Sequence, residues 1–255
     1  MQFINAKSFC FSFDIHSAYH HIDIYGPHTK FLGFAWKYDT GIRYFKFIVL
    51  PFGLSSACYV FTKVTRPLIK KWRGEGKNIL MYLDDGLGSH PDEDVCTAMA
   101  AKAKQDLILS EFVPKNEKST WQPIRQIIFL DYVIDTDLEI LSIPEKRLLK
   151  LSATIDDIGL LITQNFRIQV KKIASLVGQI ISMSYVIGNV AHIMTKYLSI
   201  DILSADTWNS VITLSDDSIE QISFWKNNLS DINIRKFLAT LFCIVTLVLR
   251  DTVGT

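Results

Sequence analysis

Two adjacent carboxylates at the end of a short apolar segment constrain this chain more than any other feature. Asp84 and Asp85 follow the apolar run 78–83 and precede Gly86. An Asp-Gly pair between two short apolar segments is a strong signal for a β-hairpin. The sequence therefore predicts a hairpin that carries two acids at or beside a tight turn.

A second apolar segment, 11–15, carries its own acid, Asp14, and predicts a strand that brings a third carboxylate to one end. Carboxylates gathered in this way raise one another's pKa unless a cation lies among them. Mg²⁺ prefers oxygen ligands and is often held by one or two carboxylates together with substrate phosphates. The three acids therefore indicate phosphoryl-transfer chemistry, although solvent-exposed turn aspartates are the simpler alternative.

The composition sets loose limits on the fold and the partners. A chain of 255 residues can form one large domain or two modest ones. Its formal net charge of +1 shows no general affinity for nucleic acid, so any basic surface must be local. The first residues of the sequence lack the order of charge, apolar run and small-residue site that is typical of a signal peptide, so none is expected here. The apolar run 237–249 is too short to span a bilayer and predicts a buried strand.

The cysteines form no CxxC pair and no zinc-like cluster, which favours reduced, buried thiols in an intracellular protein, in cytoplasm or nucleus. They are Cys10, Cys58, Cys96 and Cys243. Because the apolar run 237–249 is too short to span a bilayer, we expect no membrane partner.

Periodicity separates a mixed first part from a helical second part. The remaining expected strands are 31–36 and 44–50, which flank a turn at 38–41, followed by 125–134 and 138–143. The expected helices are 55–72, 91–111, 145–161 and 167–198. Pro67 predicts a kink or break in the first helix, and the change of pattern at Pro144 places a boundary near residue 143.

Several segments together resemble the palm of reverse transcriptases. In that family an acid-bearing strand, a Pro-x-Gly segment and a Tyr-x-Asp-Asp hairpin follow in the order seen here at 13–22, 50–57 and 82–85. Residues 114–119 resemble the fourth palm motif, and 129–135 resemble the hairpin that grips the primer. The motif sequences are most similar to those of DIRS-like and gypsy-like retrotransposon enzymes.

The resemblance implies an α+β fold, in which a right-hand polymerase palm with an antiparallel sheet and helices precedes an all-α thumb-like module. Residues 1–143 would form the palm with partial fingers, and 144–205 the helical thumb-like module. Residues 206–255 would hold a connection and the truncated start of a ribonuclease H-like region. Asp131 stands where the family has glycine. We expect a retrotransposon polyprotein fragment that is truncated at both ends, with most of the fingers upstream.

The implied activity is RNA-directed DNA polymerisation, which transfers nucleotides from dNTPs to a primer 3′-hydroxyl on an RNA or DNA template. By the resemblance, Asp14, Asp84 and Asp85 are the catalytic residues and metal ligands for two Mg²⁺ ions, with Mn²⁺ as a substitute. Two alternatives stay open: a catalytically inactive relic that binds nucleic acid, and a metal-dependent nuclease that uses the same acids.

The resemblance also implies a nucleotide site. Tyr19 would stand under the incoming sugar and exclude a 2′-hydroxyl, although an ordinary half-buried tyrosine is the alternative. Phe52 offers a stacking face, and Gly53 permits close approach of the backbone. Lys118 matches a lysine near the triphosphate, or is a solvated surface lysine.

A run of basic residues on the expected helix 55–72 and just after it suits a phosphate backbone, although a solvated helix face explains it equally well. The run includes Lys63, Arg66, Lys70, Lys71 and Arg73.

Overall fold

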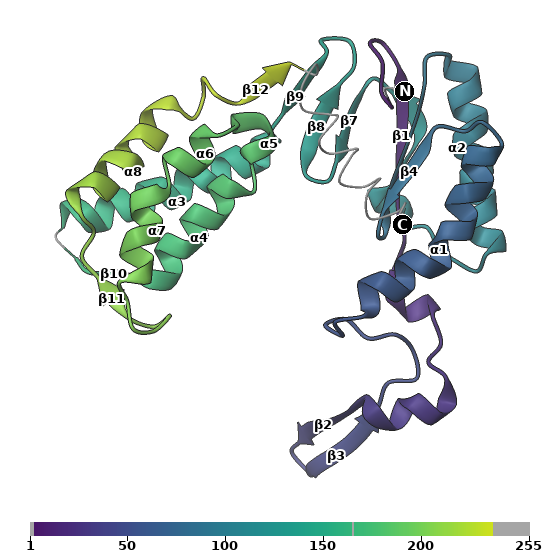
Figure 1. The fold of residues 1–255 in the computed structure, drawn as a ribbon, viewed down its shortest axis with the longest axis horizontal. Coiled ribbons are helices and arrows are strands. Elements are labelled where there is room, and N and C mark those ends of the chain that lie inside the picture. Colours follow the sequence, from purple (N-terminus) through teal and green to yellow (C-terminus); the bar gives the residue numbers. More distant parts are fainter. Residues whose placement is uncertain (1–2, 165, 237–255) are drawn as a thin grey trace. The chain divides into compact units, whose positions relative to one another are not determined.

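The computed structural model describes residues 3–164 and 166–236. The chain divides into two compact units between Phe129 and Leu130 (Figure 1). The expected boundary near residue 143 lies within the second unit.

The first unit mixes strands and helices in the order that the sequence predicts. Its strands are β1 (Phe9–Asp14), β2 (Gly33–Tyr38), β3 (Gly41–Lys46), β4 (Ile79–Tyr82), β5 (Asp85–His90), β6 (Thr120–Ile124) and β7 (Gln126–Phe129). Its α-helices are α1 (Ala57–Gly74) and α2 (Glu93–Leu109), and its 3₁₀ helices are η1 (Ala18–His21), η2 (Gly26–Phe31) and η3 (Asn116–Lys118).

An antiparallel sheet in the order β4-β5-β1-β6 forms the centre of this unit. Strand β1 lies beside β5 with Phe11 opposite Gly88, Phe13 opposite Gly86, and Asp14 opposite Asp85. The side chains of one strand alternate between the two faces of a sheet, so Phe11 and Phe13 lie on one face and Asp14 on the other.

The face that carries Phe11 and Phe13 packs against α1 and α2 to form the core (Figure 1). The buried residues of α1 recur at helical spacing and follow one stripe, as an amphipathic helix requires. They are Ala57, Phe61, Thr65, Ile69 and Trp72. Helix α2 begins after Asp92, whose side chain accepts a hydrogen bond from the Val95 N–H at 2.9 Å.

Pro67 does not break α1, so the expected break is wrong, while the expected kink stays a prediction. A proline at this position removes the hydrogen bond to the carbonyl of Lys63. Both residues lie on the exposed face of the helix, where water can satisfy that carbonyl.

Gly86 and Gly88 are required by packing, because the phenylalanine rings of β1 fill the space beside them. A Cβ atom on Gly86 would lie 2.0 Å from the ring of Phe13, and one on Gly88 would lie 2.3 Å from the ring of Phe11. The ring of Phe13 has little room to move because it also packs against Trp72 and Trp121.

Gly86→Ala is therefore expected to destabilise the fold by about 2 kcal/mol, the usual cost of overpacking a filled core. Urea denaturation measures this loss. Gly74→Ala is the matched control, since a Cβ there meets nothing within 4 Å and alanine suits a helix. Equal stability of the Gly86→Ala and wild-type proteins would contradict the packing argument.

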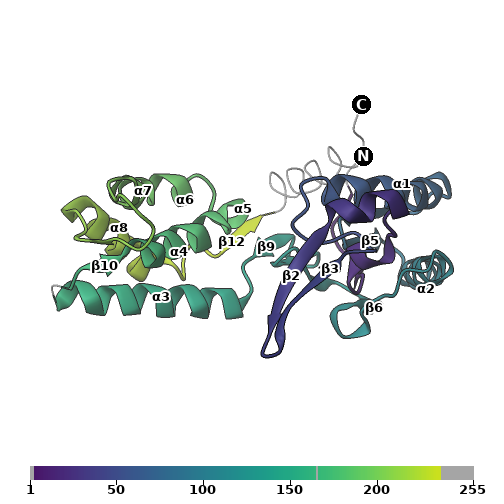
Figure 2. The same cartoon turned by 90° about the horizontal axis from the view of Figure 1, so that it is seen from below.

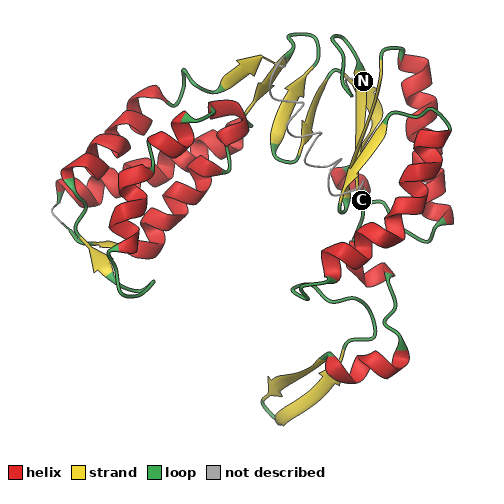
Figure 3. Cartoon of the chain, in the orientation of Figure 1, coloured by secondary structure: helices red, strands yellow, loops and turns green. Residues whose placement is uncertain are grey.

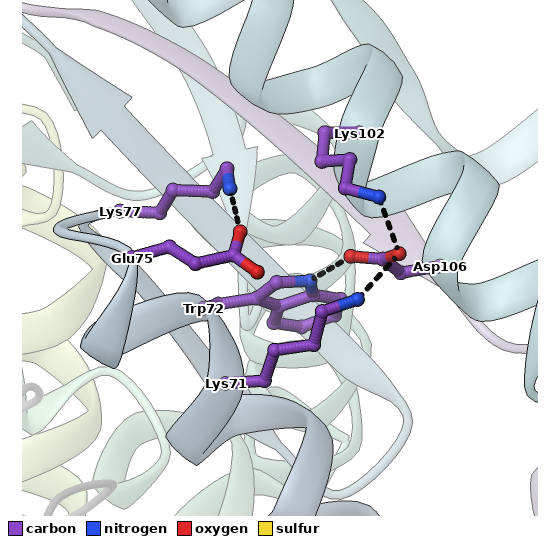
Figure 4. Close-up of polar contacts among 6 residues, drawn as sticks. All are labelled: Lys71, Trp72, Glu75, Lys77, Lys102 and Asp106. Carbon is purple, nitrogen blue, oxygen red and sulfur yellow. Dashed lines mark hydrogen bonds and ion pairs between the residues drawn. The ribbon is translucent and has the colours of Figure 1, made fainter.

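A buried carboxylate joins α1 to α2 (Figure 4). Asp106 of α2 accepts a hydrogen bond from the Trp72 indole at 3.0 Å and from Lys71 at 2.9 Å, both on α1. Lys102, one turn earlier on α2, forms a further ion pair with it at 2.9 Å. Asp106 thus bridges the two helices that cover the sheet.

Strands β2 and β3 form a separate two-stranded hairpin with the turn at Asp39 and Thr40, as expected (Figure 2). All of its strand residues are exposed. Strand β3 ends at Lys46, short of the expected 44–50. Backbone bonds between 22–24 and 48–50 connect the hairpin segment to the rest of the unit.

The second unit is mostly helical (Figure 3). Its helices are α3 (Glu145–Thr163), α4 (Val170–Ile181), α5 (Ser184–Ile187), α6 (Val190–Ile193), α7 (Lys196–Leu203) and α8 (Asp216–Asn228). Its strands are β8 (Tyr132–Asp135), β9 (Ile140–Ser142), β10 (Ile168–Gln169), β11 (Val211–Ile212) and β12 (Ile234–Lys236). Helix α3 packs against α4 and α8, and α7 also packs against both.

The expected strand 125–134 is wrong as a single element, because Leu130 and Asp131 interrupt it. Both adopt left-handed backbone conformations, with φ of 48° and 63°. Aspartate tolerates this conformation better than most residues, so it can stand at the position where the resemblance predicted glycine. Strand β6 was not predicted.

The cysteines and the C-terminal apolar run differ in what the structure shows of them. Cys10 and Cys96 are free and buried, but Cys58 is exposed, so the expectation of burial is wrong there. Cys243 and the run 237–249 lie outside the described residues. In the described parts of the chain, no helix has the length and apolar character needed to cross a membrane.

Candidate active site

The acids that the sequence singled out meet at one end of the β4-β5-β1 sheet. Asp14 is the last residue of β1 and pairs with Asp85, the first residue of β5. Directly paired residues of antiparallel strands project from the same face, so both carboxylates lie on the face opposite Phe13. Asp84 occupies the turn just before Asp85, and its carbonyl accepts the Ile15 N–H at 3.0 Å.

The hairpin turn differs from the expected one. Its two loop residues are Leu83 and Asp84, whereas Gly86 lies inside β5. Leu83 has a φ of 53°, which is uncommon for a residue other than glycine and carries strain. Such strain is frequent at functional sites, where the surroundings impose it.

The segment 113–119 fixes Asp14 from the other side. The Asp14 N–H donates to Ser119 Oγ at 3.2 Å, and its carbonyl accepts the Lys115 N–H at 2.8 Å. The Lys118 ammonium lies 3.5 Å from the Asp14 carboxylate. Asp14 and Ser119, which are 105 residues apart in the sequence, therefore meet here. The Asp14 carboxylate lies beside one positive charge, the Lys118 ammonium.

The site raises the pKa of the Asp84 carboxyl above its ordinary value. Burial is the largest cause, and the negative charge of Asp14 raises it further. A hydrogen bond to the Asp84 backbone and the Lys118 ammonium act in the opposite direction. The site thus holds two negative carboxylates, Asp14 and Asp84, whose repulsion the Lys118 ammonium offsets only in part. This arrangement favours the binding of a cation.

Tyr19 lies beside these acids. It belongs to η1, and its hydroxyl lies 3.2 Å from the sulfur of Cys58. Its ring forms edge contacts with Phe61 at 5.2 Å and with Phe52 at 4.9 Å. Burial raises the pKa of the Tyr19 phenol, the Cys58 contact adds to this, and the Asp84 charge is also felt there. The phenol therefore stays protonated at neutral pH.

Phe52 and Gly53 also reach this neighbourhood. Phe52 is 62% exposed while it touches Tyr19, which leaves a ring face open to solvent. Gly53 has a φ of 84°, a conformation that glycine adopts without strain. The structure therefore brings Asp14, Asp84 and Lys118 together, with the aromatic group next to them.

His20 and His21, the histidines that follow Tyr19, lie on η1 with it. His21 contacts the His16 carbonyl at 2.9 Å, and the His20 ring packs on Phe52.

The basic residues of α1 divide between two sides of the helix. Lys63, Arg66 and Lys70 lie opposite the buried stripe, at positions that share one face at 3.6 residues per turn. Arg73 lies near that face and is partly buried. Lys71 projects toward α2 and pairs with Asp106. Four of the five expected contacts can therefore face a ligand, and Lys71 has a structural partner instead.

The donor chemistry at the acids suits an open cation site. Within the residues that the structure describes, no three side chains of His, Cys, Asp or Glu form a group that could hold a metal by itself. Magnesium does not need such a cage, because it is commonly bound by one or two carboxylates together with substrate phosphates and water. Asp14 and Asp84 fit that requirement.

Two contributors to the site were not predicted from the sequence. Ser119 binds the backbone of Asp14, and it was visible only as the end of the segment 114–119. Cys58 contacts the Tyr19 hydroxyl, and Phe61 packs on the Tyr19 ring. Residues three apart share a helix face, so the spacing of Cys58 and Phe61 was the only sequence signal that they act on one neighbour.

Comparison with known proteins gives two matches. A family model described as "Reverse transcriptase (RNA-dependent DNA polymerase)" matches residues 3–134, just over half of the chain. A solved structure titled "Structure of the foamy viral protease-reverse transcriptase dRH in complex with ds DNA" is similar with a TM-score of 0.65 and 17% identity. The match covers 89% of this chain and 36% of that one, so this chain spans about a third of it. No curated protein matches the sequence.

Proposed function

The chain belongs to the reverse transcriptase (RNA-dependent DNA polymerase) family, and on this basis we propose that it copies RNA or DNA templates into DNA. The reaction joins the primer 3′-hydroxyl to the α-phosphate of a dNTP and releases pyrophosphate. The proposal includes an origin in a retrotransposon polyprotein, for which the sequence motifs are the support.

The meeting of Asp14 and Asp84 at the tip of the β4–β5 hairpin carries this proposal. Burial and the charge of Asp14 disfavour ionisation of Asp84, and a hard cation reverses that balance. A pair of divalent ions, Mg²⁺ or Mn²⁺, would polarise the attacking hydroxyl and neutralise the leaving phosphates. Asp14 and Asp84 would hold these ions, and Asp85 would support them from the same strand end.

Lys118 would bind the triphosphate of the incoming nucleotide, because its ammonium lies beside Asp14. Its ammonium pairs with Asp14 but its side chain is 60% exposed. An exposed ion pair contributes little to stability, so a triphosphate can attract this lysine at small cost. Lys118 would then neutralise phosphate charge near the acids.

Tyr19, Phe52 and Gly53 would form the floor for the incoming nucleotide. The Tyr19 ring lies next to the acids and is fixed by other rings, so it can exclude a 2′-hydroxyl by steric contact. Phe52 would stack on a base, as exposed aromatic rings do in nucleic-acid sites.

The basic face of α1, defined by the exposed Lys63 and Lys70 and the half-buried Arg66 with Arg73 beside it, would contact the phosphate backbone of the primer–template. Such contacts act by charge and are independent of sequence. Lys71 fits this role less well because Asp106 engages it.

Primer extension by the purified chain tests the proposed function. A labelled DNA primer on an RNA template, supplied with dNTPs and Mg²⁺, should lengthen. A shortened primer would show a nuclease instead, and an unchanged primer would show a relic that only binds. Either result would overturn the proposal.

Tyr19→Ala is expected to admit ribonucleotides, lowering the ratio of kcat/KM for dNTP over rNTP by roughly 100-fold. The variant removes the ring that would collide with the 2′-hydroxyl. Tyr19→Phe is the matched comparison, because it keeps the ring and should lose far less of the discrimination than Tyr19→Ala. Single-nucleotide incorporation assays give both ratios, and unchanged discrimination in Tyr19→Ala would remove this role.

A further inference from the structure

We propose that Cys58 is a positioning residue, whose contact with the Tyr19 hydroxyl holds the Tyr19 ring in the position needed for sugar discrimination. The inference rests on the proposed polymerase function and goes beyond it by assigning a role to a side chain outside the acid and nucleotide sites.

The N-terminal part of α1 contacts Tyr19 at two points. The Cys58 sulfur lies 3.2 Å from the Tyr19 hydroxyl, and the Phe61 ring packs edge-on against the Tyr19 ring at an interplanar angle of 89°. Cys58 and Phe61 are three residues apart on the helix and share one face. One helix therefore fixes both the polar end and the flat side of the tyrosine.

The backbone around Tyr19 does not by itself fix the position of the ring. Tyr19 lies in the four-residue 3₁₀ helix η1, which follows Ser17 in a left-handed conformation with φ of 49°. The bonds within η1 run from the His20 N–H to Ser17 and from the Ile22 N–H to Tyr19. Short 3₁₀ segments have poor hydrogen-bond geometry, so side-chain contacts set the ring position to a large extent.

The contact also keeps the hydroxyl away from the acids. Asp84 is close enough for its charge to raise the pKa of the Tyr19 phenol. Without the sulfur, the hydroxyl would lose its partner and could turn toward that carboxylate. A tilt of the ring would change the clearance for a 2′-hydroxyl more than the clearance for a deoxyribose.

A double-mutant cycle tests the role of Cys58. The measured quantity is the ratio of kcat/KM for dNTP over rNTP in wild type, Cys58→Ala, Tyr19→Phe and the double variant. Loss of one hydrogen bond, roughly 1 kcal/mol, predicts a fall of about fivefold in each single variant. The double variant should fall no further, because both changes remove the same contact. Cys58→Ser should restore most of the ratio.

The neighbouring Tyr59→Phe is the matched control. Tyr59 lies on the same turn of α1 and is 65% exposed, so loss of its hydroxyl should leave the ratio at the wild-type value. A wild-type ratio in Cys58→Ala, or independent losses in the double variant, would overturn the inference while the polymerase function stood. A wild-type chain that extends no primer would overturn the proposed function and the inference with it.

A spectroscopic measurement tests the contact without catalysis. In protein labelled with [¹³Cζ]tyrosine, the Tyr19 resonance is identified by its absence from Tyr19→Phe. It should shift in Cys58→Ala at neutral pH and stay in place in Tyr59→Phe. A Tyr19 resonance that does not respond to Cys58→Ala would show that the thiol does not hold the hydroxyl.

Discussion

Asp84→Asn is expected to lower the rate of primer extension at least roughly 1,000-fold, since the site depends on charge neutralisation by bound cations. Asn keeps the size of the side chain and the Ile15 N–H bond to the backbone carbonyl, so the hairpin should keep its shape. The loss would therefore report the missing carboxylate charge. Steady-state extension of a labelled primer measures it.

The same variant should be slightly more stable than wild type in the absence of metal. The pKa of Asp84 is higher in the folded protein than in an unfolded chain. A carboxyl of this kind supports folding at acidic pH, below its unfolded pKa, and this support disappears as the pH rises through the folded pKa. At neutral pH the charge opposes folding, and Asn removes it. The unfolding midpoint should rise by roughly 2 °C.

Asp39→Asn is the matched control for both measurements, because Asp39 also occupies a hairpin turn, between β2 and β3. It should extend primers at the wild-type rate. Normal extension by Asp84→Asn would rule out the proposed role of these acids, whatever its stability. Lost activity together with a large fall in the unfolding midpoint would instead show a folding defect.

The sequence predicted the strands and the hairpin of the site well, because each of them depends on residues that are close together in the sequence. The α+β palm with a helical thumb-like module is confirmed by the mixed sheet-and-helix units and by the similarity to the foamy viral structure. The hairpin at 79–90 was predicted from an Asp-Gly pair, yet the glycine serves to accommodate the Phe13 ring and the turn lies before it. The prediction succeeded for a partly wrong reason.

What the sequence could not predict depends on contacts between distant segments. The proximity of Ser119 to Asp14, and of Cys58 to Tyr19, comes from the packing of separate elements. The left-handed residues Leu130 and Asp131 interrupt an apolar run that otherwise reads as one strand. The roles of Asp14, Asp84 and Asp85, and the domain limits at 143 and 205, stay predictions.

Asp106→Ala is expected to cost about 3 kcal/mol of unfolding free energy. The substitution leaves the Trp72 indole N–H, which is fully buried, without its acceptor, and an unsatisfied buried donor of this kind is costly. It also removes the ion pair between Lys71 of α1 and α2, and leaves Lys102 of α2 without the carboxylate that it contacts (Figure 4). Urea denaturation of the full chain measures the loss.

The pH dependence distinguishes the charge of Asp106 from its packing. Burial alone would raise the pKa of this carboxyl, but hydrogen bonds from Lys71, Lys102 and Trp72 lower it to about 2. A group with a lowered folded pKa supports folding above its unfolded pKa, here 3.8, and this support is lost as the pH falls toward 2. The stability gap between wild type and Asp106→Asn should therefore be full at neutral pH and shrink between about pH 4 and pH 2. Asp94→Asn, an exposed change at the start of the same helix, should show a much smaller gap. A gap for Asp106→Asn that is independent of pH would mean that shape, and not ionisation, holds the two helices together.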